Sequence, residues 1–142
     1  MIPAWLEIAL REMGVKEVPG AESNPRITQY ASATTLAASS DEVPWCSSFA
    51  CWCLEQAGIK STRSAAARSW LDWGQVLEQP REGAIVVFRR GTPPSGHVSF
   101  YVGPDADPAY CRCVGGNQGD MVKASRYPIA DILGIRWPIE MK

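Results

Sequence analysis

The spacing of apolar residues changes midway along the chain, and this change constrains the fold more than any other feature. Before residue 74, apolar side chains recur every three or four positions, which is typical of helices that bury one face. After residue 83 they form short β-branched runs or alternate with polar residues, which is typical of strands. Helices followed by strands predict an α+β fold with an antiparallel sheet.

The first half of the chain predicts three helices and one short helical turn. The helix that follows Pro44 is apolar nearly all round, and a helix without a polar face is a buried one. Ser64 is the expected N-cap of the third helix. The predicted helices cover residues 3–13, 45–57 and 64–73, and the helical turn covers residues 27–31.

The second half predicts five strands. Along one of them the alternation is strict, so Val98 and Phe100 are expected on one face and His97 and Ser99 on the other. A short β-branched run in this half is typical of a buried strand. The predicted strands cover residues 83–88, 97–103, 110–114, 121–125 and 134–137.

Length and charge exclude several kinds of protein. The 142 residues, 46% of them apolar, are expected to form one domain that spans residues 1–142. The chain has 14 basic and 15 acidic side chains, so it has no positive field that would attract nucleic acid. No run approaches the ~20 apolar residues of a membrane span. Charged residues interrupt the apolar start, so we expect a protein that is synthesised in the cytoplasm without a signal peptide. We also expect it to be a monomer.

The cysteines and the single histidine limit the metal chemistry. One histidine excludes zinc sites built on two or three imidazoles. Cys51 and Cys53 are two positions apart on a predicted helix, so their side chains point to nearly opposite sides and cannot share one ion. We expect buried free thiols and no metal or cofactor. The alternative is a disulfide among Cys51, Cys53, Cys111 and Cys113.

Cys46 is the candidate nucleophile because it lies at the start of the buried helix. Unpaired backbone N–H groups at a helix N-terminus favour the thiolate, which is the reactive form of cysteine, and lower its pKa. The same groups, the N–H of Cys46 first among them, are donors for an oxyanion. The alternative for this position is a small apolar residue that merely starts a core helix.

His97 is the candidate general base, because it is the only imidazole and opens a strand after a turn rich in glycine and proline. Asn117 follows in a glycine-flanked turn. Its amide oxygen is expected to accept a hydrogen bond from Nδ1–H of His97, which leaves Nε2 facing the thiol of Cys46. Taken singly, His97 fits a core histidine and Asn117 a turn residue. Together with Cys46 they predict nucleophilic catalysis.

Three segments of the chain contain these residues: 44–49 (Pro-Trp-Cys-Ser-Ser-Phe), 96–103 (Gly-His-Val-Ser-Phe-Tyr-Val-Gly) and 115–118 (Gly-Gly-Asn-Gln). They resemble the catalytic segments of papain-like bacterial cell-wall cysteine peptidases, the NlpC-like and CHAP amidase families. The resemblance is strongest to a small branch found in phage endolysins. It implies a papain-like fold in which N-terminal helices, the nucleophile helix among them, pack on an antiparallel β-sheet.

The resemblance implies that Cys46 is the nucleophile, His97 the general base and later acid, and Asn117 the residue that orients the ring. It implies that the substrate is bacterial peptidoglycan. The bond cut is an amide of the peptide part, so the activity is that of an N-acetylmuramoyl-L-alanine amidase or of a stem or crossbridge endopeptidase. An arginine in the groove is suited to pair with a stem-peptide carboxylate. The candidate groove residues are Trp45, Tyr30, Arg68 and Trp70.

Two biological roles fit these expectations. One is a phage-type endolysin that reaches the cell wall after release, and the other is an antibacterial toxin that is delivered into rival cells and blocked by an immunity protein. Two other functions stay open: a non-catalytic cell-wall-binding module with a buried structural thiol, and a glycosidase that uses two carboxylates such as Glu7 and Glu17. The products separate them, because amide cleavage creates amines and glycosidic cleavage creates reducing ends.

Overall fold

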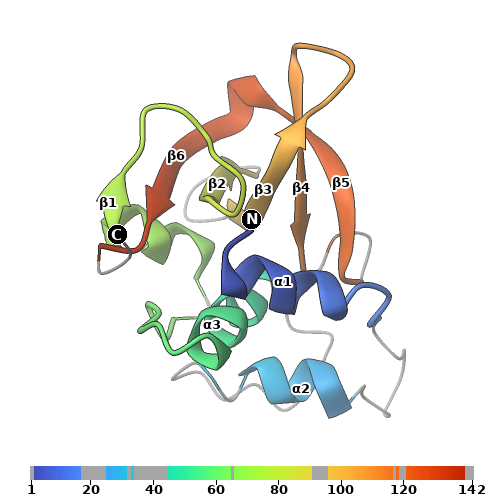
Figure 1. Cartoon of the computed structure of the whole chain (residues 1–142), viewed down its shortest axis with the longest axis vertical. Helices are drawn as coiled ribbons and strands as arrows, with labels where there is room; N and C mark the ends of the chain where they lie inside the picture. The colour runs from blue at the N-terminus through green and yellow to red at the C-terminus, as the bar shows by residue number, and fades with distance from the viewer. Residues whose placement is uncertain are drawn as a thin grey trace.

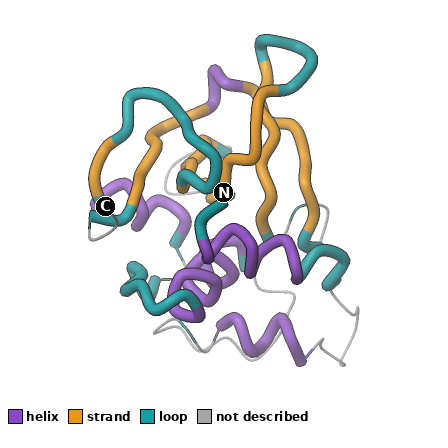
Figure 2. Tube along the Cα trace, in the orientation of Figure 1, coloured by secondary structure: helices purple, strands orange, loops and turns teal. Residues whose placement is uncertain are grey.

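The computed structural model describes residues 2–16, 25–31, 33, 45–64, 66–90, 96–116, 118 and 121–139. Within this part of the chain, strands build one sheet and the α-helices gather at one end of it (Figure 1; Figure 2). The predicted α+β class with an antiparallel sheet is confirmed. No helix in the described ranges combines the length and the apolar character that crossing a bilayer requires.

Three α-helices and one 3₁₀ helix form the first half, close to the predicted segments. The helix after Trp45 is buried as expected, since each residue from Cys46 to Leu54 is buried. The first helix packs through Trp5, whose indole N–H donates to the carbonyl oxygen of Gly83 at 2.8 Å. The helices are α1 (Ala4–Arg11), α2 (Pro25–Ala31), α3 (Cys46–Gln56) and η1 (Ala67–Asp72).

The sheet has six strands in the order β1-β6-β2-β3-β4-β5, and neighbouring strands run antiparallel. Five of the strands correspond to the predicted ones. The sixth, β1, is only two residues long and exists because Gln75 pairs with Trp137. The strands are β1 (Gln75–Val76), β2 (Ile85–Arg89), β3 (Gly96–Pro104), β4 (Tyr110–Gly115), β5 (Lys123–Pro128) and β6 (Ile132–Trp137).

Two local predictions were wrong. The third helix is a 3₁₀ helix preceded by Ala66, and Ser64 does not cap it, because its Oγ accepts the N–H of Ala66 at 3.1 Å inside a tight turn. The predicted strand 121–125 is displaced toward the C-terminus, because Met121 forms only an isolated bridge with Lys16 before β5 begins.

The start of β3 is covered on both faces. Phe100 faces α3, where its ring lies 6.5 Å from that of Phe49. His97 faces the other side, where its ring lies 5.1 Å from that of Tyr127 on β5. The predicted assignment of Phe100 and His97 to opposite faces is therefore confirmed. Because both faces are covered, the polar Ser99 is as buried as its apolar neighbours.

The five cysteines are free and buried, as expected. Cys51 lies within 3.6 Å of Thr62 Oγ1 and 3.7 Å of the carbonyl oxygen of Ser64, so its thiol has polar partners inside the fold. In the described part of the chain, no three His, Cys, Asp or Glu side chains cluster in a way that could hold a metal ion.

Candidate active site

Cys46 is the first residue of α3 and lies against the start of β3. The backbone N–H groups of Val98, Ser47 and Cys46 itself act on its thiol and favour the thiolate. The N-terminus of α3 therefore meets β3 beside His97. This proximity is not visible in the sequence, where Cys46 and His97 lie far apart.

The electrostatics of Cys46 differ from the expectation. The side chain is buried, with 5% of the residue exposed, and this burial raises the pKa of the thiol above its ordinary value. The three N–H groups and the charge of Arg90 act in the opposite direction but do not compensate. The prediction of a lowered pKa was wrong, because the loss of hydration destabilises the thiolate more than the helix N-terminus stabilises it.

His97 is the second residue of β3, and only 1% of it is exposed. Its Nε2 lies 2.9 Å from Ser99 Oγ, 3.1 Å from Gln118 Oε1 and 3.1 Å from the hydroxyl oxygen of Tyr127. The ring of Tyr127 also stacks on that of Phe88, with centroids 4.8 Å apart. Three oxygens thus surround one nitrogen of the imidazole.

The orientation of Gln118 identifies the proton on that nitrogen. The side-chain amide N–H₂ of Gln118 donates to the carbonyl oxygens of Lys123 at 2.6 Å and Cys113 at 3.3 Å, so its Oε1 is the atom that faces His97. Oε1 only accepts, and it already accepts the hydroxyl of Ser99. Nε2 of His97 therefore carries the hydrogen, and Nδ1 has the free lone pair.

Nδ1 of His97 is buried and has no hydrogen-bond partner, not even the thiol of Cys46. Among the described residues it is the one buried side-chain nitrogen or oxygen in this condition. The expectation that Nδ1 is held was wrong, because Gln118 holds the opposite nitrogen, Nε2. Asn117, the expected orienting residue, lies outside the described residues, as does Pro44.

The imidazole is neutral near pH 7. The pKa of His97 is lowered to about 4, mainly by burial and also by the positive charge of Arg90, while the hydrogen bond to Gln118 acts in the opposite direction. Together with the raised pKa of Cys46, this means that the resting pair is a thiol and a neutral imidazole. The same burial raises the pKa of the Tyr127 phenol, so this hydroxyl keeps its proton.

Two glycines allow this packing. A Cβ atom on Gly116 would lie 2.6 Å from Cζ3 of Trp45 and 2.7 Å from Cβ of Phe49, at the head of α3. A Cβ atom on Gly115 would lie 2.6 Å from Oγ of Ser99. Real Cβ contacts are not this short, so side chains here would push the backbone at these two glycines away from the head of α3 and from Ser99.

Three of the four expected groove residues are core residues. Trp45 is 2% exposed and Tyr30 and Trp70 are 0% exposed, so none of them offers surface to a ligand in this structure. Tyr30 stacks on Trp45, with centroids 5.9 Å apart, and the indole of Trp70 donates to Ser47 Oγ at 2.9 Å. Their rings support α3, and a place for these three residues in the groove stays a prediction.

Arg68 differs from the other expected groove residues. Its side chain is half-buried, and its Cγ lies 3.2 Å from the position that a Cβ on Gly96 would occupy. Gly96 precedes His97 directly. Of the four expected groove residues, Arg68 is therefore the one that lies beside the candidate site and is partly exposed to solvent.

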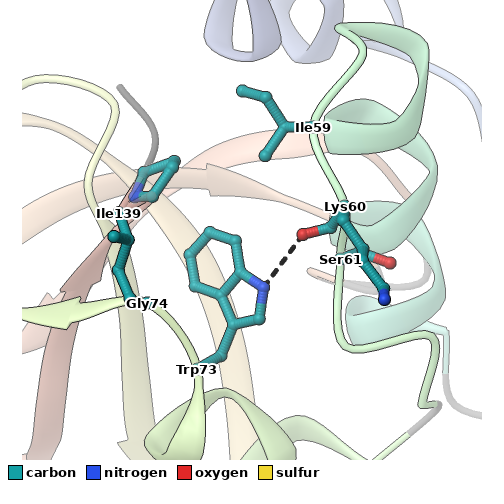
Figure 3. A pocket seen from close by; sticks show the side chains of 7 residues that line it. Ile59, Lys60, Ser61, Trp73, Gly74 and Ile139 are labelled. Atoms are coloured by element: carbon teal, nitrogen blue, oxygen red, sulfur yellow. Dashed lines mark hydrogen bonds between the residues drawn. The ribbon is translucent and has the colours of Figure 1, made fainter. Parts of the chain in front are cut away.

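A cavity of about 290 Å³ lies at another place in the fold. Figure 3 shows the indole of Trp73 pointing at Lys60, whose carbonyl oxygen accepts its N–H at 3.0 Å. The lining contains neither cysteine nor histidine, so this cavity has no thiol and imidazole pair. It is lined by Ile59, Lys60, Ser61, Trp73, Gly74, Pro138 and Ile139.

Sequence reasoning missed Gln118, Ser99 and Tyr127, which hold His97. Gln118 is adjacent to Asn117 in a recognised segment, so a signal for it existed, whereas nothing local distinguishes Tyr127.

In comparison with protein families, residues 38–117 match the family described as CHAP domain. This stretch includes Cys46 and His97, while Gln118 and Tyr127 follow it. No curated protein matches the chain.

Proposed function

The chain belongs to the CHAP domain family, and from this premise we propose that it hydrolyses an amide bond in the peptide part of peptidoglycan with Cys46 as the nucleophile. Membership of the family indicates a cell-wall amidase or peptidase. The observation that supports Cys46 is its position at the head of α3, where the backbone N–H of Val98, the residue after His97, favours the thiolate. The papain-like arrangement of helix and sheet is part of the proposal.

In the first step the neutral imidazole acts as a general base. Nδ1 of His97 has a free lone pair, and it takes the proton of the Cys46 thiol as the sulfur attacks the carbonyl carbon of the substrate. Because the resting pair is neutral, charge develops only when the substrate is bound. The proton on Nδ1 then passes to the leaving nitrogen, the C–N bond breaks, and a thioester and an amine form.

In the second step water cleaves the thioester. Nδ1 of His97 accepts a proton from the water as its oxygen attacks the acyl carbon, and the same proton returns to the sulfur as the C–S bond breaks. The products are a carboxyl group and the free thiol of Cys46. The backbone N–H groups of Cys46 and Ser47, which face the sulfur, are the donors proposed for the oxyanion in both steps.

The three oxygens around Nε2 stabilise the imidazolium that exists between these proton transfers. Gln118 Oε1 accepts its hydrogen, and the hydroxyl oxygens of Ser99 and Tyr127 lie 2.9 and 3.1 Å from Nε2, which offsets the burial that otherwise disfavours the charge. We assign Gln118 as the orienting residue, the role that the sequence analysis expected of Asn117. Arg68, beside Gly96, is the proposed contact for a stem-peptide carboxylate.

The bond cut is proposed to be either the N-acetylmuramoyl-L-alanine amide or an amide of the stem or crossbridge. Mass spectrometry of muropeptides from purified peptidoglycan names it, with Cys46→Ala as the matched control. New amino and carboxyl ends that the wild type generates and Cys46→Ala does not are the expected result. New reducing ends, or equal products from both proteins, contradict the proposal.

The biological role follows from where the protein meets its substrate. We propose that the monomer is synthesised in the cytoplasm and acts on the cell wall, either as an endolysin after release or as a toxin that an immunity protein neutralises. Expression in the cytoplasm and in the periplasm of a test bacterium separates these compartments. Lysis only on periplasmic expression supports action on the wall, and lysis on cytoplasmic expression alone contradicts it.

The burial of Cys46 favours one other function, a cell-wall-binding module with a structural thiol. Such a module binds peptidoglycan and releases no product. Sedimentation with purified walls tests it beside the muropeptide analysis. Wall binding by both wild type and Cys46→Ala, with no new ends in either digest, would identify the binding module.

A further inference from the structure

Cys111 and Cys113 form a pair of thiols that the proposed hydrolysis does not use. They lie two positions apart on β4, so both side chains leave the same face of the sheet. Their sulfur atoms are 4.0 Å apart. Arg112 between them is exposed and pairs with Asp105 at 3.3 Å.

One of the two sulfurs opens onto a cavity. Cys111 lines a space of about 520 Å³ together with Tyr101, Tyr110 and three isoleucines. Cys113 is not among the residues that line this space, and it is 0% exposed. A small ion that enters the cavity meets Cys111 first and then reaches Cys113.

The distance between the sulfurs suits a bridging ion. Two thiolates bound to one ion with bonds of ~2.3 Å lie about 3.8 Å apart at a tetrahedral angle and about 4.6 Å apart when linear. The observed 4.0 Å falls inside this range. A disulfide needs the sulfurs at about 2.05 Å, and residues i and i+2 of a strand are about 6.7 Å apart at Cα, near the upper limit for a disulfide.

The surroundings decide which ion. No third His, Cys, Asp or Glu joins the two cysteines in a cluster among the described residues, although Glu78 also lines the cavity. Zinc requires four ligands, and calcium and magnesium require several oxygens. Copper(I) is a soft ion that binds stably with only two thiolate ligands. We propose that Cys111 and Cys113 form a two-coordinate site for copper(I), reached through the cavity.

Binding of copper(I) releases the protons of both thiols, because a metal binds cysteine as the thiolate.

Copper(I) supplied with a reductant to the full chain tests the site, in competition with a chromogenic copper(I) chelator of known affinity. We expect one ion per chain, and an affinity reduced more than tenfold in Cys111→Ser and in Cys113→Ser. Cys51→Ser is the matched control, because Cys51 is buried on α3 with polar partners and is expected to keep the wild-type affinity. No ion bound by the wild type, or equal affinity in Cys111→Ser, would overturn the proposal.

X-ray absorption of the copper-loaded wild type gives a second test that needs no variant to fold. Two sulfur neighbours and no others are expected, and any other set of neighbours contradicts the site. Neither measurement depends on hydrolysis of peptidoglycan, so failure of this inference is distinguishable from failure of the proposed function.

Discussion

Gln118 holds His97 by Nε2, at 3.1 Å, and leaves Nδ1 free. The amide of Gln118 is itself fixed, because its N–H₂ group donates to the carbonyl oxygens of Lys123 and Cys113. The ring therefore has one tautomer and one orientation before any substrate binds. Such preorganisation is what a general base in a nucleophilic site requires.

Replacement of Gln118 tests this relationship directly. In Gln118→Leu the ring loses its acceptor, so we expect kcat to fall about 10²-fold, at the lower end of what a positioned general base contributes, with a smaller change in KM. In Gln118→Glu the added carboxylate is expected to raise the pKa of His97 from about 4. Nitrogen chemical shifts of the single histidine measure both its pKa and its tautomer.

Gln56→Ala on the exposed end of α3 is the control for these variants. It is expected to leave the histidine spectrum and kcat unchanged. An unchanged tautomer in Gln118→Leu would show that Ser99 and Tyr127 orient the ring without Gln118.

The stability of the fold is expected to depend on pH through His97. Its pKa is about 4 in the folded protein and ~6.5 in the unfolded chain, so the unfolded chain binds the extra proton between these values. The free energy of unfolding therefore rises with pH from about 4 to 6.5, by about 3 kcal/mol. Below pH 4 and above pH 6.5 this contribution is constant.

Urea unfolding at a series of pH values measures this dependence. His97→Gln serves as the comparison, because it removes the only imidazole and keeps a polar side chain. The slope between pH 4 and 6.5 is expected to be smaller in His97→Gln than in the wild type. Equal slopes in the two proteins would mean that the ring titrates alike in the folded and unfolded states.

Gly116→Ala is expected to destabilise the protein by about 1–3 kcal/mol, as overpacking does in a filled core. The added Cβ would meet Trp45 and Phe49 at 2.6 and 2.7 Å. Gly103→Ala is the control, since nothing lies within 4 Å of a Cβ at that position, and its change is expected within 0.5 kcal/mol. Thermal or denaturant unfolding compares the two. Equal losses in both would refute the close approach at Gly116.

Ser47 and Trp70 are expected to be coupled. Ser47→Ala removes the acceptor of the Trp70 indole and a donor to the carbonyl oxygen of Ser64, and the buried N–H left unpaired makes the cost about 1–3 kcal/mol. Trp70→Phe removes that N–H. The double variant is then expected to lose about 1 kcal/mol less than the sum of the single losses. Additive losses in a double-mutant cycle would show that this hydrogen bond contributes nothing.

Local pattern determined the kinds of element and their order. The helical spacing before residue 74 and the alternation after residue 83 depend on which face of an element meets the core, and both periods are visible within a few residues. The same holds for the burial of α3 and for the placement of Cys46 at its head. The sequence also limited the general base to His97, since the chain has one histidine.

Tertiary structure decided the electrostatics and the partners of the site. Gln118 and Tyr127 are 21 and 30 positions from His97 in the chain, and no periodicity relates residues so far apart. The direction of both pKa shifts depends on burial from several elements at once, so a helix N-terminus alone gave the wrong sign for Cys46. Local periodicity is therefore enough to place the sulfur and the imidazole on their elements, while long-range packing sets their charge and the orientation of the ring.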